Sequence, residues 1–152
     1  MRRVEKEIKD RSTIEEILQR AVVCRLAVCE GNTPYIVPLN FGYKRGRLYF
    51  HSAPEGRKIE AIKANPNICF EVDVDLELVP DDIPCDWTVR YRSVIGFGRA
   101  HLLERTEEKR EALDVILGHY AQGPFEYTQE AVAQVAIIEV EIESLTGKQS
   151  GY

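Results

Sequence analysis

The residues with the clearest chemical potential lie between His51 and Lys58. A strand ends in His51 and Ser52, a loop containing a glycine follows, and a helix opens with Arg57 and Lys58. Helix N-termini present free N–H groups and a partial positive charge. Here a guanidinium fork, an ammonium group and a hydroxyl would join them. The segment therefore predicts a seat for a phosphate dianion. Its spacing matches neither a Walker loop nor a dinucleotide fingerprint, so a nucleoside triphosphate is not implied.

The sequence of the same segment also fits two less specific interpretations, namely solvated cations and a structural histidine. Arginine and lysine at the start of a helix are often simply solvated. His51 could donate a proton near neutral pH, but a lone histidine at a strand end is more typical of a structural group. His101 and His119 lack the spacing of metal ligands, and we expect both to be structural or exposed.

Charge is unevenly distributed along the chain. The 152 residues carry 25 acidic and 20 basic side chains, a net charge of −5, which argues against a nucleic-acid-binding surface. Seven of the acids fall between Glu71 and Asp86, where there is no base, so the rest of the chain is slightly basic. This segment lacks the glycine and the closing glutamate of a calcium loop. It predicts an extended, solvated loop and no metal site.

Cysteine usage and hydropathy bear on the compartment. Four cysteines without C-x-x-C spacing favour buried, reduced thiols, as expected in the cytoplasm. No apolar run is longer than four residues, so we expect no membrane-spanning helix. The charged N-terminus lacks the apolar stretch of a signal peptide. A cytoplasmic protein without membrane partners is predicted.

The elements that must position the chemical groups are mostly strands. Ser12, with Glu15 three residues later, forms a capping box for a first helix, and Thr106 can cap a second long helix. Strands are expected at residues 22–29, 35–43, 47–52, 68–74, 91–103 and 135–143, with a short helix at 57–64.

The order of these elements predicts the fold class. The first three strands follow one another through short turns and would form an antiparallel meander. Pro34 and Pro38 mark an edge or a bulge in the second strand, and Gly96 and Gly98 suggest a bend in the fifth. The chain predicts one domain over residues 1–152, mainly β with flanking helices: a six-stranded antiparallel barrel.

Four segments, in the same order along the chain, resemble one known family. They are Pro34-Tyr35-Ile36-Val37-Pro38-Leu39-Asn40-Phe41-Gly42-Tyr43, Leu48-Tyr49-Phe50-His51-Ser52 through Gly56-Arg57, Tyr91-Arg92-Ser93-Val94-Ile95-Gly96-Phe97-Gly98-Arg99-Ala100, and Thr146-Gly147-Lys148. They resemble the pyridoxamine 5′-phosphate oxidase-like FMN-binding split-barrel proteins, and within them the nitroimidazole-resistance (Nim) branch. The resemblance runs from about Asp10 to Lys148.

The resemblance implies a homodimer of six-stranded split barrels with two FMN sites at the subunit interface. The phosphate of FMN would be held by Ser52, Arg57 and Lys58. The strand from Val37 through Pro38 and Leu39 to Asn40 would run beside the isoalloxazine, and Arg92, Ser93 and Val94 would help to build the site from the partner subunit. His51 would lie near the active site. Trp87 would either cover the flavin or pack at the dimer interface, and packing is the favoured interpretation. Residues that recognise vitamin B6 do not stand out.

The working hypothesis is an FMN-dependent oxidoreductase that passes electrons to a small acceptor, such as a nitroaromatic compound. The flavin carries the redox chemistry, so the protein need supply only binding, orientation and electrostatics. His51 is the candidate proton donor. Two alternatives remain: a flavin-binding carrier or sensor without catalysis, and a split barrel that binds haem or a deazaflavin instead.

Overall fold

The computed structural model describes residues 3–152 and contains one antiparallel sheet of eight strands. Its order is β3-β2-β6-β7-β8-β5-β4, and β1 pairs with β8. The strands are β1 (Glu7–Ile8), β2 (Cys24–Glu30), β3 (Thr33–Leu39), β4 (Gly42–Lys44), β5 (Arg47–Ser52), β6 (Asn67–Val79), β7 (Thr88–Leu102) and β8 (Ala136–Ser150). The helices are α1 (Arg11–Arg20), α2 (Arg57–Ala64), α3 (Thr106–Gly118) and α4 (Gln129–Gln134), with short 3₁₀ turns at Val4–Lys6 and Pro84–Asp86.

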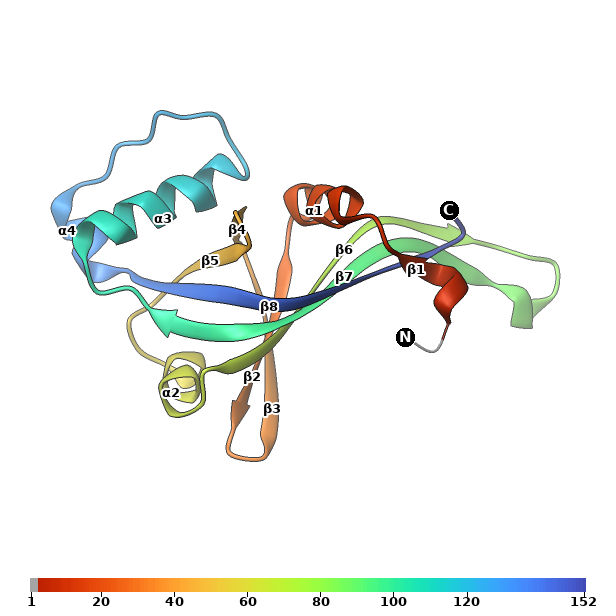
Figure 1. The fold of residues 1–152 in the computed structure, drawn as a ribbon, viewed down its shortest axis with the longest axis horizontal. Helices are drawn as coiled ribbons and strands as arrows, with labels where there is room; N and C mark the ends of the chain where they lie inside the picture. The colour runs from red at the N-terminus through yellow and green to blue at the C-terminus, as the bar shows by residue number, and fades with distance from the viewer. Residues whose placement is uncertain (1–2) are drawn as a thin grey trace.

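The sheet curls around one core, and the helices lie outside it. Figure 1 shows α1 and α3 on one side of the sheet and α2 on the other. The two outermost strands, β3 and β4, do not pair with each other, so the sheet is not closed. The sequence-based prediction of a mainly β, antiparallel split barrel with flanking helices is confirmed. No described helix is long and apolar enough to cross a membrane.

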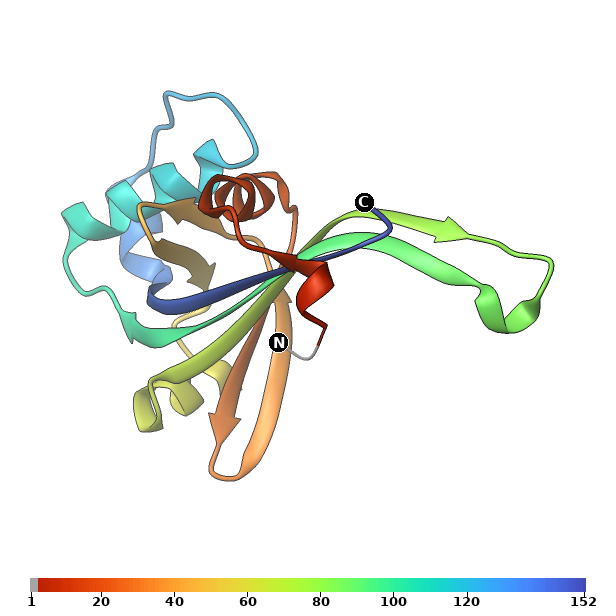
Figure 2. The ribbon, with the colours of Figure 1, turned by 45° about the vertical axis from the view of Figure 1, so that its right-hand side comes forward.

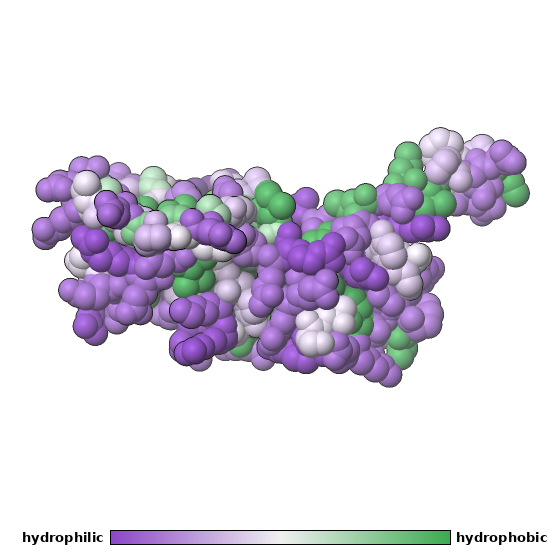
Figure 3. All heavy atoms as spheres, turned by 90° about the horizontal axis from the view of Figure 1, so that it is seen from above, coloured by the Kyte–Doolittle hydropathy of each residue, from purple (hydrophilic) through white to green (hydrophobic). Residues whose placement is uncertain are grey.

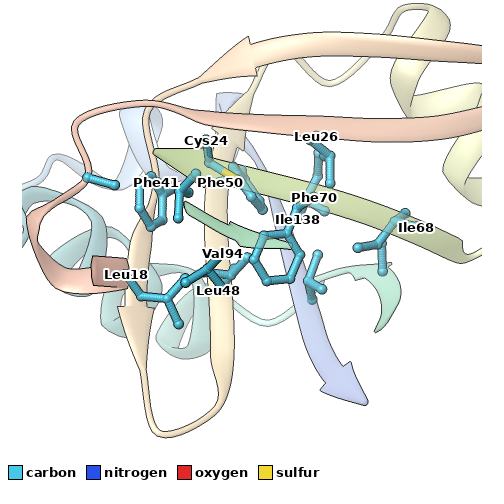
Figure 4. Packing of buried hydrophobic residues seen from close by; sticks show 14 of the residues in the cluster. Leu18, Cys24, Leu26, Phe41, Leu48, Phe50, Ile68, Phe70, Val94 and Ile138 are labelled. Atoms are coloured by element: carbon cyan, nitrogen blue, oxygen red, sulfur yellow. The ribbon is translucent and has the colours of Figure 1, made fainter. Parts of the chain in front are cut away.

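The core is built from one side of each long strand. Phe50, Phe70 and Val94 are buried on the concave face, and Leu18 of α1 closes one end (Figure 4). Alternate residues of a strand point to opposite faces, which explains the alternation of buried and more exposed positions along β6. Burying each large aromatic or aliphatic side chain contributes about 1.5–3 kcal/mol. This core fixes the ends of β5 and β7, which carry the predicted site residues.

The prediction of six strands was too low by two. The stretch expected as one strand at residues 35–43 is divided into β3 and β4. Between them Phe41 turns inward to a fully buried position, and its N–H donates to the Tyr120 hydroxyl at 2.9 Å. Gly42 then passes so close to α3 that a Cβ atom would lie 2.5 Å from the Val115 oxygen. The two residues of β1 are too few for a periodic pattern to reveal.

The predicted meander of the first three strands is present only in part. β2 pairs with β3 and β4 pairs with β5, both antiparallel, as expected. However, β3 and β4 lie at opposite edges of the sheet, and β5 also pairs with β8, where Ser52 lies opposite Ala136. The chain crosses from one edge of the sheet to the other after Leu39, because the buried Phe41 anchors it beneath α3. This crossing places β5 between β4 and β8, so that Ser52 at its end lies beside β8 rather than beside β3.

The acidic segment is a β-hairpin arm and not a solvated loop. Most of its residues belong to β6, which with β7 forms a ribbon that projects from the body (Figure 2). Asp75 pairs with Arg20 and with Arg92, and Asp73 pairs with Arg25. Hydrogen bonds from Arg20 lower the pKa of Asp75 most strongly. The stabilisation from this carboxylate is therefore present above its ordinary pKa and is lost as the pH falls through the lowered value.

Two predicted helix caps were misplaced. Asp10, not Ser12, caps α1, because its carboxylate accepts from the Thr13 N–H at 2.9 Å. The N-cap of α3 is Arg105, without a side-chain hydrogen bond, and Thr106 is the first helical residue. The predicted bounds of α2 are those observed, whereas the short helix α4 was not predicted.

The bend predicted near Gly96 and Gly98 is present and leads to a stability prediction. The register between β7 and β8 shifts between Phe97 and Gly98. A Cβ atom on Gly98 would lie 2.3 Å from the backbone oxygen of Glu141. We expect Gly98→Ala to lower the free energy of unfolding by about 1–3 kcal/mol, since backbone cannot move aside as a side chain can.

Urea denaturation measures this effect, with Gly118→Ala as the matched control. A Cβ atom on Gly118, the last residue of α3, meets nothing within 4 Å. That substitution should be neutral or stabilising by less than about 1 kcal/mol. Equal midpoints for the two variants would contradict the close approach of β7 and β8.

Candidate functional site

Ser52 ends β5 with a buried hydroxyl that has no partner. Its side chain follows the inward positions of Leu48 and Phe50 and is 8% exposed. No hydrogen-bond partner for its Oγ is present among the described residues. A buried hydroxyl without a partner costs about 1–3 kcal/mol, so such groups usually meet a ligand or ordered water. Ser52 therefore offers a donor to a ligand that approaches the end of β5.

The start of α2 lies a few residues further along the chain and is also open. Gly56 takes a φ of +123°, which only glycine adopts readily, and no side chain caps the helix. The Gly56 oxygen accepts from the amides of Ile59 and Glu60 at 2.9 and 3.1 Å. The first two amides of the helix, those of Arg57 and Lys58, precede this ladder and can face a ligand.

The two cations of this segment have different surroundings. Arg57 donates from Nε to Glu30 at 2.8 Å and lies 4.3 Å above the ring of Tyr35. These contacts tie the start of α2 to the β2–β3 hairpin and offset part of the guanidinium charge. Lys58 is half-buried and has no ion pair within residues 3–152. Of the two, Lys58 is the cation more available to a phosphate.

The predicted flavin-flanking strand lies at an open edge. β3 pairs with β2 alone, so one side of its backbone is free of intrachain partners. Val37 and Leu39 are half-buried, and Pro38 and Asn40 are exposed. An open strand edge presents N–H and C=O groups to a ligand or to another chain. Pro38 removes one donor from this edge and limits ordinary strand addition there.

His51 precedes Ser52 but lies on the other face of β5. It is exposed and sits opposite Ile137 in the register with β8. Because successive strand residues point to opposite faces, the structure does not bring the imidazole and the Ser52 hydroxyl together. His51 therefore cannot share one ligand atom with Ser52 from the same side of the strand.

The structure places Arg92, Ser93 and Val94 far from Ser52 within one chain. Arg92 lies opposite Gln149 of β8, and Ser52 lies opposite Ala136. These two positions of β8 are 13 residues apart, which is about 40 Å along the strand at about 3.3 Å per residue. A ligand the size of a flavin cannot contact both groups in one protomer.

The environments of these three residues differ. Arg92 bonds to Asp75 at 2.9 Å and lies 4.5 Å above the Tyr152 ring, while its buried Nε has no partner within residues 3–152. Ser93 is 9% exposed. Val94 is fully buried in the core, so its backbone alone could meet a cofactor.

An exposed apolar strip crosses the convex face of the sheet. Ile36, Ala27, Cys69 and Phe97 lie side by side on four neighbouring strands. Ile36 and Phe97 are more than half exposed, and Ile95 lies one row away and is 42% exposed. Sequence reasoning missed this strip, although the apolar residues on both faces of β7 were a signal for it.

The arm carries further exposed apolar side chains. Leu76, Leu78, Ile83, Trp87 and Val89 are all at least 40% exposed, and Figure 3 shows hydrophobic atoms along the projecting end of the molecule. The Trp87 indole N–H donates to the Asp81 oxygen at 2.6 Å, which fixes the ring at the tip. Soluble monomers rarely expose contiguous apolar surface of this kind.

A hollow lies beneath α3 and is lined by none of the predicted site residues. It measures about 1180 Å³ and is floored by Tyr49, Glu139 and His101 on three neighbouring strands. His101 lies 3.1 Å from the Glu139 carboxylate. Burial and Glu139 raise the pKa of Tyr49 to about 12. His119 contacts the Ala21 oxygen at 2.7 Å.

Groups of metal ligands are not found in the part of the chain that the structure describes. No three His, Cys, Asp or Glu residues there could hold an ion. The four cysteines are unpaired, but only Cys24 is buried, and burial raises the pKa of its thiol. The expectation of buried thiols was wrong for Cys85, which is exposed, and Cys29 and Cys69 are half-buried. The segment from Ser52 to Lys58 instead offers a hydroxyl, open helix amides and a cation, which suit an anionic oxygen ligand.

Comparison with known proteins adds to this description. The family model described as pyridoxamine 5′-phosphate oxidase matches residues 10–149. A curated relative, an uncharacterized protein of Rhizobium meliloti, is 31% identical over 65 residues, which are 43% of this chain and 42% of that protein. The chain thus matches less than half the length of that relative.

Two solved structures extend the comparison over the whole fold. A candidate 5-nitroimidazole antibiotic resistance protein of Bacteroides thetaiotaomicron is 38% identical, with a TM-score of 0.85 over 94% of this chain and 86% of that one. A FAD-binding protein of Mesorhizobium loti is 26% identical, with a TM-score of 0.69 over 93% of this chain and 96% of that one.

Proposed function

This chain belongs to the pyridoxamine 5′-phosphate oxidase family, and from that premise we propose that it is a homodimeric flavoprotein. In this proposal each dimer holds two FMN molecules at the subunit interface and passes electrons to a small-molecule acceptor. When bound, the flavin supplies the redox chemistry. The residues of this chain bind it, orient it and limit its contact with water.

One observation carries the proposal: the buried hydroxyl of Ser52, without a partner among the described residues, is followed along the chain by the uncapped start of α2. A phosphate oxygen would accept from this hydroxyl and from the open amides of α2, and Lys58 would offset the charge. A phosphate fits the Ser52 hydroxyl, the open amides and Lys58, because each of them is a donor or a cation. Of the nearby acids, Glu30 already holds Arg57, and Glu55 is exposed in the loop before α2.

A second copy of the chain would complete the site. Arg92 lies about 40 Å from Ser52 along β8. We therefore infer that Arg92, Ser93 and Val94 contribute to the flavin that is bound mainly by the partner subunit. The apolar strip that ends in Ile36 and Phe97, together with Ile95 beside it, supplies an apolar surface on which the two sheets would pack. The open edge of β3, at Val37 to Asn40, would then lie beside the flavin ring.

His51 is proposed as the proton donor to the reduced acceptor. Its imidazole is exposed on the face opposite Ser52, and histidine changes charge near neutral pH. Water can replace an exposed donor, so we expect His51→Ala to lower the rate of acceptor reduction by about tenfold, the small end of general-acid effects. Flavin content should not change. Equal rates at equal flavin content would leave His51 without a chemical role.

Turnover tests the proposed activity directly. The FMN-loaded protein, mixed with NADH or NADPH and a panel of small acceptors that includes a nitroaromatic compound, should oxidise the nucleotide. Bound flavin without turnover would overturn the oxidoreductase and favour the carrier or sensor. A Soret band in the purified protein would overturn FMN as the cofactor and favour haem.

Ser52→Ala makes the phosphate seat testable through stability. Removal of an unpartnered hydroxyl should raise the free energy of unfolding of the flavin-free protein by about 1 kcal/mol. The same change should weaken FMN binding by about fivefold to tenfold, since one hydrogen bond is lost. Urea denaturation and a flavin titration measure the two effects.

Thr128→Ala is the contrasting control. The Thr128 hydroxyl has a partner, since it accepts from the Ala131 N–H at 3.1 Å and caps α4. Its loss should destabilise the protein by about 1 kcal/mol and leave FMN affinity unchanged. If both variants destabilise alike, the Ser52 hydroxyl is already satisfied and the seat is wrongly placed.

A further inference from the structure

A second hollow, lined by basic residues, lies at the base of the β6–β7 arm, far from the end of β5. It measures about 410 Å³, which is within the range of small-molecule pockets. Its lining combines three basic residues with hydroxyl-bearing and apolar side chains: Arg3, Lys6, Thr88, Val89, Tyr91, Lys148 and Ser150. No acidic residue of the described chain, residues 3–152, lines it. The walls of this hollow are formed by the end of β8, the start of β7 and the N-terminal 3₁₀ turn.

The three cations of this hollow have no anionic partner within residues 3–152. Lys6 donates to the neutral Ser150 hydroxyl at 2.8 Å, and Lys148 lies 5.5 Å above the Tyr91 ring. Arg3 makes no ion pair there. By contrast, Arg20, Arg25 and Arg92 are each bound to carboxylates. Three like charges around one space repel each other unless an anion offsets them.

Nearby acids do not fill this role. Glu7 lies opposite Lys148 in the register of β1 and β8, yet the two form no ion pair. Glu5 is exposed on the 3₁₀ turn, and Glu77 is paired with Arg90. None of the three carboxylates lines the hollow.

We propose that Arg3, Lys6 and Lys148 form a binding site for a small phosphate-bearing anion. The ammonium groups of Lys6 and Lys148 attract the phosphate, and the Arg3 fork can bind two of its oxygens. The hydroxyls of Ser150 and Tyr91 add neutral donors. The hollow is large enough for more than the phosphate alone, and Val89 and Tyr91 provide apolar surface for the attached group.

The first experiment titrates the flavin-free protein with inorganic phosphate, monitored by calorimetry or by amide chemical shifts. The Lys6→Ala/Lys148→Ala variant should bind phosphate about tenfold more weakly or worse. Lys44→Ala/Lys63→Ala, which removes the same charge outside the hollow, should match the wild type. Equal weakening in both variants, or none in the first, would overturn the site.

Lys6→Arg/Lys148→Arg protects the test against a folding defect. It keeps the charges, so it should retain most of the phosphate affinity that the alanine variant loses. Affinity for phosphate should also fall as sodium chloride is added, because the interaction is between exposed charges. An arginine variant as weak as the alanine variant, with an unchanged thermal transition, would contradict a charge-based site.

A second titration identifies the source of the phosphate. If the anion is a separate ligand, the phosphate binding that Lys6→Ala/Lys148→Ala removes persists in the FMN-saturated protein, whose Ser52 seat is already filled. If the hollow holds the phosphate of a flavin bound by the partner subunit, FMN abolishes that binding. The first titration does not depend on flavin binding, so a protein that binds phosphate but no FMN would refute the proposed function and leave this site intact.

Discussion

Replacing Lys58 with alanine is expected to weaken FMN binding by about tenfold to a hundredfold, the effect of losing one charge-assisted hydrogen bond. Lys58 is the cation of the phosphate seat without an ion pair in residues 3–152, whereas Arg57 already binds Glu30. The affinity for riboflavin, which has the same ring but no phosphate, should stay the same. Fluorescence titrations with FMN and with riboflavin measure the two affinities.

Lys63→Ala is the matched control for this prediction. Lys63 lies in the same helix, and its ammonium group pairs with Glu60 at 3.1 Å. Its removal changes the net charge equally but touches no part of the seat. A loss of FMN affinity that is the same for both variants would reflect net charge alone. A loss for riboflavin as large as that for FMN would show that Lys58 does not hold the phosphate.

Replacing Phe97 with aspartate is expected to separate the dimer and to remove the flavin together with it. Phe97 is 55% exposed on the apolar strip between two neighbouring strands. In a packed interface an unpaired carboxylate would lose its hydration, which costs several kcal/mol. Because Ser52 and Arg92 lie so far apart in one chain, a monomer would keep only half of the site.

Size-exclusion chromatography with light scattering, together with the flavin absorbance of the purified protein, measures both consequences. Val22→Asp is the control, since Val22 is 66% exposed in the link between α1 and β2 and lies off the strip. It should remain dimeric and retain flavin. A Phe97→Asp protein that stays dimeric places the interface elsewhere. One that is monomeric and still binds flavin shows that the site is complete in one chain.

The parts of the fold that depend on neighbouring residues could be predicted from the sequence. The bounds of α2 follow from Gly56 before it and Asn65-Pro66 after it, which are local signals. The bend at Gly96 and Gly98 could likewise be predicted from these two neighbouring glycines alone. The polar groups of the phosphate seat lie within a few residues of one another, so their proximity needed no knowledge of the sheet.

The parts that depend on distant residues could not. The pairing of Ser52 with Ala136 joins two strands that are far apart in the sequence, and the hydrophobic pattern does not encode a partner. Asp75 resembled a solvated acid because its arginine partner, Arg20, lies 55 residues away. The separation of Arg92 from Ser52 is also a property of the sheet. Because of this separation, the predicted site residues fall into two half-sites, one around Ser52 and one around Arg92.

The measurement that tests the central claim most directly is a titration of the flavin-free, folded protein with FMN. The proposal predicts quenching of the flavin fluorescence, a dissociation constant in the micromolar range or below, about −8 kcal/mol or better, and saturation at one FMN per chain. Unchanged flavin fluorescence up to about 100 µM FMN, well above the range in which a specific cofactor site binds, would contradict it.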